Sequence, residues 1–119
     1  METSKDINCQ IAKWLGFEIH KGKEGIYKVE RSEHTKRYIP LDFLHDRNQQ
    51  KWIEDFILKK GYKIITQQEK KATLIQIGKN KYPFNPIIET ENQKKNTAFI
   101  QAVEQLIDNE NDTSKNLQS

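Results

Sequence analysis

The chain has 119 residues, of which 31% are charged, and its formal net charge at pH 7 is +3. This length predicts one domain with a modest core, and no apolar run approaches the roughly 18–20 residues that span a bilayer. The N-terminal residues lack the basic-then-apolar pattern of a secretory signal. A single cysteine, Cys9, excludes an internal disulfide, so we expect a cytoplasmic protein that does not enter a membrane.

Charge is unevenly distributed along the chain. Residues 59–95 contain nine lysines against three glutamates, whereas residues 96–119 contain one lysine against four carboxylates. A basic middle region suits an anionic partner, although lysines on turns and helix ends are often simply solvated. The absence of arginine there weakens the case for phosphate recognition, because lysine lacks the bidentate fork. If the partner is nucleic acid, the candidate residues are Lys59, Lys60, Lys63, Lys70 and Lys71.

The spacing of apolar residues predicts a first amphipathic helix, with a stripe formed by Ile7, Ile11, Trp14 and Leu15. Two strands, residues 17–20 and 26–30, follow around a polar turn. Residues 31–37 are predicted to form a loop. Residues 38–46 contain a proline but are rich in apolar side chains, so we expect them to lie against the core without regular structure.

Asp46 and Gln49 have the spacing of a capping box and predict a second helix over residues 47–60. One face of this helix is apolar and consists of Trp52, Ile53, Phe56 and Ile57. Strands are predicted over residues 62–66 and 72–77, around a polar turn.

Two prolines exclude a regular element over residues 79–86, and residues 86–89 are expected to be extended. A third helix is predicted to begin near Thr90 or Asn92 and to end near Asp108. Its apolar stripe consists of Phe99, Ala102, Val103 and Leu106. Residues 109–119 are polar, and we expect them to be disordered.

The resulting order is α-β-β-α-β-β-α, which predicts an α/β (α+β) fold in a single domain over residues 1–108. The four strands are expected to form one antiparallel sheet. Leu74, Ile75 and Ile77 form a nearly continuous apolar run, which indicates burial on both sheet faces and favours an α/β/α sandwich. The alternative is a two-layer α+β domain with one bare sheet face. We find no internal sequence repeat.

Several segments of the sequence match a known family pattern. They are the helix end IAKWLGFEI, the segment IPLDFLHD, Trp52 in the second helix, the pair Gly61-Tyr62 and the stretch ETENQKKNTAFIQAVEQLI. Over about residues 5–108 the chain therefore resembles the phage ABA-sandwich domain family, a group of small phage and prophage proteins. That family has no established activity or catalytic residues. The resemblance implies a small accessory protein of a phage or mobile element.

No catalytic or metal-binding pattern is evident in the sequence. His20, His34 and His45 do not have the spacing of metal ligands, although His45 beside Asp46 is a candidate pair. There is no phosphate loop, no nucleophile elbow and no glycine-rich dinucleotide loop. We therefore expect a protein that is not an enzyme, with no catalytic residues, bound metal or cofactor.

One loop combines aromatic and basic side chains. Its candidate partner-binding residues are Lys79, Lys81, Tyr82 and Phe84. Exposed aromatic side chains next to lysines can anchor a protein partner or stack on bases. The alternative is that the loop folds back and buries Phe84 in the core.

Two functional hypotheses follow. The first is a non-enzymatic phage or prophage accessory protein that binds a host protein, with interference in a host defence system as one role. The second is a nucleic-acid-binding module that uses the lysine-rich region of residues 59–95.

Overall fold

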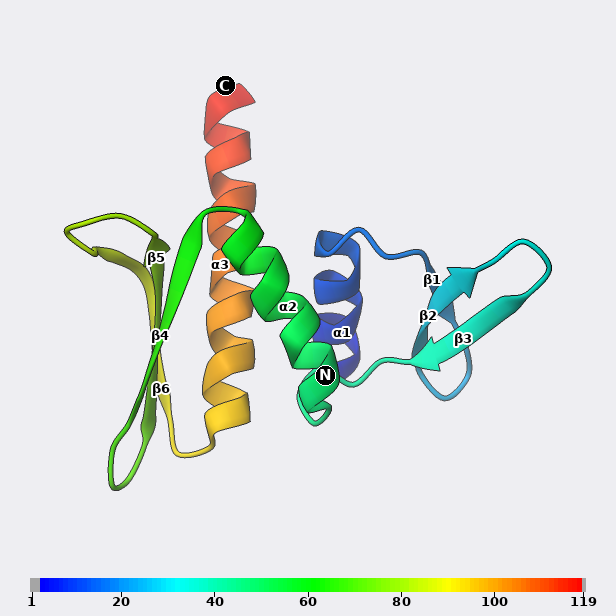
Figure 1. Ribbon diagram of the computed structural model, residues 1–119, viewed down its shortest axis with the longest axis horizontal. Coiled ribbons are helices and arrows are strands. Elements are labelled where there is room, and N and C mark those ends of the chain that lie inside the picture. The colour runs from blue at the N-terminus through cyan, green and yellow to red at the C-terminus, as the bar shows by residue number, and fades with distance from the viewer. Residues whose placement is uncertain (1–2, 119) are drawn as a thin grey trace. The chain divides into compact units, whose positions relative to one another are not determined.

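The computed structural model describes the backbone of residues 3–118 and the side chains of residues 7–111. The described chain has three helices and six strands (Figure 1). The helices are α1 (Thr3–Trp14), α2 (Arg47–Lys59) and α3 (Lys95–Gln118). The strands are β1 (Ile19–Lys21), β2 (Ile26–Arg31), β3 (Lys36–Pro40), β4 (Tyr62–Gln68), β5 (Thr73–Lys79) and β6 (Pro86–Asn92).

The chain divides into two compact units, Met1–Gln50 and Lys51–Ser119. Helix α2 begins in the N-terminal unit and continues into the C-terminal unit. Each unit contains its own three-stranded antiparallel sheet, with strand order β1-β2-β3 in the first and β4-β5-β6 in the second.

In the N-terminal unit, α1 packs against β1 and β2. Ile11 and Ala12 are fully buried, whereas Ile7, Trp14 and Leu15 of the predicted stripe are half-buried. The helix ends at Trp14, and Gly16 two residues later has a φ of 85°, in the left-handed region that favours glycine. The amide of Gly16 donates to Lys13 and that of Phe17 to Ala12, so two otherwise unpaired carbonyls at the helix end are satisfied.

The segment between β3 and α2 is held by amide side chains. The side chain of Asn8 donates to Leu41 O and accepts the amide of Phe43, at 3.4 and 3.1 Å. Gln49 donates to Pro40 O at 2.7 Å and accepts the amide of Asp42 at 2.8 Å. These bonds satisfy the backbone of an irregular segment in which Leu41 and Phe43 are buried.

The predicted capping box is therefore half correct. Asp46 Oδ1 accepts the amides of Asn48 and Gln49, at 2.9 and 3.2 Å, and so caps α2. The Gln49 side chain makes its bonds to the segment before the cap, in place of the predicted bond to the Asp46 amide. Farther along α2, Ile53 and Ile57 are fully buried, whereas Trp52 and Phe56 are half-buried.

In the C-terminal unit, α3 lies along one face of the sheet and packs against β5 and β6 (Figure 1). The apolar stripe of α3 is buried at Phe99, Ala102, Val103 and Leu106, as predicted. On the sheet, Ile75 and Ile77 face this helix and are at most 1% exposed. Leu74 and Gln76 alternate with them and are only half-buried, so helix α3 covers one face of this sheet.

The α+β class is confirmed, but the single four-stranded sheet and the order α-β-β-α-β-β-α are wrong. Both missing strands contain proline: β3 ends at Pro40 and β6 begins at Pro86. Each is an edge strand that pairs with one neighbour, so a proline at its end removes no essential ladder bond. The proline in residues 38–46 therefore did not exclude a strand, and residues 86–89, which were expected to be extended, belong to a strand that pairs with β5.

The start and end of the last helix also differ from the prediction. Thr90 lies in β6, where its hydroxyl donates to Ala98 O at 2.7 Å, and Asn92 accepts the amide of Lys94 before the helix begins. Helix α3 begins at Lys95 and continues past Asp108 through Gln118, so its backbone is helical where a disordered tail was expected. Ser119, the last residue of that predicted tail, lies outside the described residues.

We predict that Ile77→Ala lowers the free energy of unfolding by about 2–5 kcal/mol, because it removes a fully buried side chain and leaves a cavity. Ile87→Ala on the next strand is the control, because that side chain is 45% exposed and its loss should be much smaller. Urea unfolding followed by circular dichroism measures both. Equal losses would mean that Ile77 does not face a packed core.

Candidate functional site

Most of the lysines singled out from the sequence meet at one end of the C-terminal sheet. The amide of Asn80, after β5, donates to Gly61 O before β4 at 2.9 Å. The strand register places Tyr62 opposite Lys79 and Lys63 opposite Gly78. The turn before β4 and the loop after β5 therefore lie together. We call this surface the basic end; its exposed lysines are Lys59, Lys60, Lys63, Lys79 and Lys81.

The loop of the basic end contains one aromatic side chain that is exposed and one that is partly buried. Tyr82 is 97% exposed, whereas Phe84 is half-buried. A Cβ added at Gly78 would lie 3.1 Å from Phe84 Cε1 and 2.5 Å from Asn85 O. The loop thus closes against the backbone of β5 where no side chain stands. Phe84 is thus partly buried, as the alternative of a loop folded against the core predicted, whereas Tyr82 points into solvent.

Two lysines of the basic end have partners within the chain. Lys60 Nζ lies 3.3 Å from a carboxylate oxygen of Glu110, and the Tyr62 hydroxyl donates to the other oxygen at 3.4 Å. Burial of Tyr62 and the negative charge of Glu110 raise the pKa of that tyrosine above its usual value. Lys79 Nζ lies 4.6 Å from the centre of the Tyr62 ring. These contacts fix the end of β4 against α3.

The remaining candidate lysines, Lys70 and Lys71, lie in the turn between β4 and β5. This turn is at the opposite end of two seven-residue strands from the basic end. At about 3.3 Å per residue, the separation is roughly 20 Å. The lysines predicted as one nucleic-acid-binding set are therefore divided between two ends of the sheet. Their role in binding stays a prediction.

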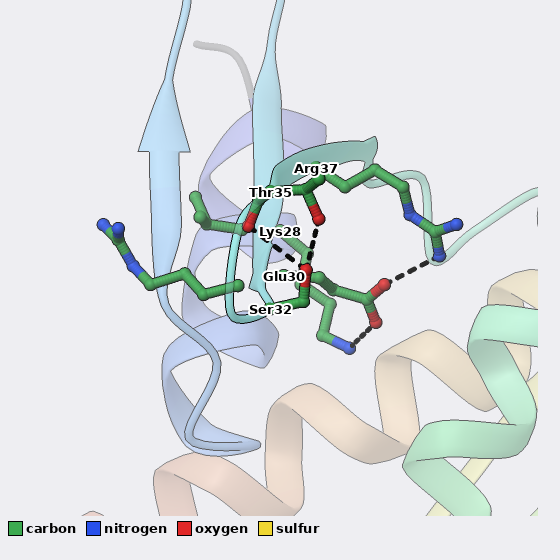
Figure 2. A pocket seen from close by; sticks show the side chains of 7 residues that line it. Lys28, Glu30, Ser32, Thr35 and Arg37 are labelled. Atoms are coloured by element: carbon green, nitrogen blue, oxygen red, sulfur yellow. Dashed lines mark hydrogen bonds and ion pairs between the residues drawn. The ribbon is translucent and has the colours of Figure 1, made fainter.

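A second charged surface lies beside the turn between β2 and β3 in the N-terminal unit. It is a hollow of about 480 Å³, and Figure 2 shows the side chains that line it. Glu30 accepts hydrogen bonds from Lys28 Nζ at 2.9 Å and from Arg37 Nη2 at 2.8 Å. The hydroxyls of Ser32 and Thr35 are hydrogen-bonded to each other. Because Glu30 partly neutralises both cations, the hollow is a poor site for a free anion.

The Glu30 pairs predict a pH dependence. The hydrogen bond from Lys28, and then that from Arg37, hold the pKa of Glu30 below its usual value of 4.5. A lowered folded-state pKa stabilises the fold above pH 4.5, and this contribution is lost as the pH falls through the lowered pKa. Glu30→Gln should therefore reduce the loss of stability on acidification, measured as the urea midpoint across acidic pH. Glu33→Gln, in the exposed turn, is the control; identical profiles for the two variants would contradict the prediction.

His45 pairs with a different carboxylate from the one suggested by sequence. Its Nδ1 lies 3.0 Å from both oxygens of Asp42, whereas Asp46 is occupied in capping α2. Both side chains of the pair are more than half exposed, next to a hollow of about 560 Å³. Among the residues described, no three side chains of the metal-ligating types converge. Nothing in this pair provides a nucleophile or a buried base.

Sequence reasoning missed a cluster of ring side chains on the N-terminal sheet. His20, Tyr27 and Tyr38 come from three different strands, and the imidazole lies 6.4 and 5.3 Å from the two tyrosine rings. The alternation of residues along β2 is sufficient to place Tyr27 and Val29 on one face of a strand. Tyr38 could not be added to that face, because residues 36–40 were not expected to form a strand.

No family model, curated protein or solved structure matches the chain. Within the described part of the chain, no helix has both the length and the apolar character needed to cross a membrane.

The closeness of Gly78 to the loop yields a further prediction. Gly78→Ala should lower the melting temperature and increase proteolytic cleavage between residues 79 and 86, because the new methyl group would collide with the backbone of Asn85. Thermal melting and limited proteolysis measure the two effects. Gln76→Ala on the same strand should leave the loop protected. An unchanged cleavage rate in Gly78→Ala would show that the loop does not depend on this contact.

Proposed function

We propose that this protein is a non-enzymatic binding protein whose basic end contacts an acidic surface of a host protein. The observation that carries the proposal is the exposure of Tyr82, at 97%, among the lysines of that surface. A tyrosine supplies a large, rigid contact area together with a polar hydroxyl, and such residues dominate binding energy at interfaces.

The loop combines this contact area with restricted motion. Phe84 and Asn85 lie against Gly78, and Pro83 follows Tyr82 directly. A loop that is already held loses less conformational entropy on binding. Lys79 and Lys81 would attract an acidic partner and increase the association rate, and this effect weakens with salt.

The biological setting is proposed from the family resemblance. The likeness to phage ABA-sandwich proteins supports a phage or prophage accessory protein that acts in the bacterial cytoplasm. A small binding protein of this kind could block a host protein by occupying its surface, and interference in a host defence system is one such role. This part of the proposal depends on sequence segments and not on the geometry of the basic end.

Nucleic acid is the alternative partner of the same surface. The five lysines of the basic end could contact phosphates, but this surface lacks arginine. If binding occurs through phosphates, the logarithm of the affinity should fall steeply and linearly with the logarithm of the salt concentration. A protein partner held by Tyr82 would retain most of its affinity at moderate salt.

The double variant Lys81→Ala/Tyr82→Ala tests the proposal. We expect a melting temperature close to that of the parent, because Tyr82 is almost fully exposed, and at least about tenfold weaker capture of the partner. Affinity capture from bacterial lysate identifies the partner, and titration with the purified partner gives the affinity.

The matched comparison is Lys70→Ala/Lys71→Ala, which removes positive charge from the opposite end of the same sheet. Partner capture that is kept in Lys70→Ala/Lys71→Ala but lost in Lys81→Ala/Tyr82→Ala supports the basic end as the binding surface. Recovery of the bait alone in repeated captures would count against a protein partner. Loss of stability in step with loss of binding would show that the loop is part of the core.

A further inference from the structure

One face of the N-terminal sheet presents rings and cations together. In the register of this sheet, Tyr27 lies opposite His20 on β1 and Pro40 on β3. Val29 lies opposite Tyr38, and Arg31 lies opposite Lys36. Directly opposed residues, and alternate residues along one strand, point to the same side of a sheet. We call this side the ring face; its defining side chains are His20, Tyr27, Arg31, Lys36 and Tyr38.

The rings form a continuous group across all three strands. The His20 ring from β1 and the Tyr38 ring from β3 have centres 5.3 Å apart at an interplanar angle of 60°, although β2 lies between their strands. The Tyr27 ring from β2 lies 6.4 Å from the imidazole. Val29 on the same face is only 8% exposed, but His20 and Tyr38 remain exposed, and Tyr38 is 45% exposed. The rings are therefore accessible to a ligand.

Positive charge borders the rings on the side toward the turn after β2. Lys36 Nζ lies 5.5 Å from the centre of the Tyr38 ring. Arg31 is held by two bonds to the carboxylate of Glu18, at 2.7 and 2.6 Å, which fixes the plane of its guanidinium. With Glu18 counted, residues 18–40 contain six lysines and arginines against four glutamates, and the strand register places Lys21, Lys28 and Arg37 on the opposite face of the sheet. Because Arg31 is paired with Glu18, Lys36 beside Tyr38 is the cation of the ring face that an anion would meet.

We propose that the ring face is a stacking platform for single-stranded nucleic acid. Unpaired bases stack on aromatic and histidine rings presented by an open sheet, while lysines beside the rings contact the phosphates. Lys36 holds the position of such a phosphate contact next to Tyr38. A duplex would not expose its bases to a flat sheet, because duplex readers insert a helix or ribbon into a groove. An uncharged or basic peptide would not use the positive border.

This proposal does not rest on the basic end, because the ring face belongs to the other compact unit. The two surfaces also differ in chemistry: the basic end carries five lysines around one exposed tyrosine, whereas the ring face carries three adjacent rings bordered by Arg31 and Lys36. Variants of each can be tested separately.

The test measures fluorescence anisotropy of a labelled oligo(dT), an oligo(rU) of the same length and a duplex DNA at low salt. The full chain should bind both single strands in preference to the duplex. Tyr38→Thr removes a ring but keeps a good strand former and should weaken binding by about tenfold, whereas Tyr38→Phe should preserve it. Lys36→Gln should make the affinity less dependent on salt.

Ile87→Thr is the matched control, because Ile87 is also 45% exposed and lies on an edge strand of the other sheet. It should lose as much stability as Tyr38→Thr while binding the oligonucleotides like the parent. Absence of single-strand binding at low salt, or equal binding by Tyr38→Thr and Tyr38→Phe, overturns the proposal. Oligonucleotide binding that is lost in Lys81→Ala/Tyr82→Ala but kept in Tyr38→Thr also overturns the proposal. The same holds if no oligonucleotide binds and Tyr38→Thr instead abolishes capture of a protein.

Discussion

The N-terminal unit depends on the way in which amide side chains satisfy the backbone between β3 and α2. Leu41 and Phe43 bury their side chains in this short irregular segment, and buried peptide groups without partners are costly. Asn8 and Gln49 supply those partners, and Gln50 adds bonds to the carbonyls of Phe43 and Leu44 at 2.9 and 3.1 Å. Because these bonds satisfy the backbone, only six irregular residues are needed to connect the end of β3 to the start of α2.

A comparable constraint shapes the basic end. Helix α2 stops at Gly61, which has a φ of 89°, and β4 begins at the next residue. Gly78 then leaves the space in which Phe84 and Asn85 approach β5. Gly61 allows the chain to change direction between α2 and β4, and Gly78 allows the loop to approach β5 closely. Together they place Tyr82 and the surrounding lysines on a defined surface, although no strand or helix contains Tyr82.

The two sheets are introduced in the same way, although the sequence shows no repeat. Before each sheet a helix is followed by a glycine of positive φ and an aromatic residue, and three strands then form an antiparallel meander; the C-terminal unit adds α3. The outer features differ: the N-terminal sheet carries rings on one face, and the C-terminal sheet carries lysines at one end. The same local sequence pattern thus precedes two sheets with chemically different surfaces, and each surface has its own proposed ligand.

Apolar periodicity and glycine stops act within a few residues, so they were enough to predict three helices, four of the strands and the α+β class. The sequence also singled out the loop around Tyr82 and the lysines near it, but it left open whether this loop is exposed or packs against the core. Only the tertiary structure decided that Pro40 and Pro86 stand at the ends of edge strands, since strand position depends on neighbours distant in the chain. The same reason explains why His20 meets Tyr38, because this contact follows from a strand register that no local pattern records. The separation of Lys70 and Lys71 from the basic end, in contrast, was already implied by the predicted turn between residues 66 and 72.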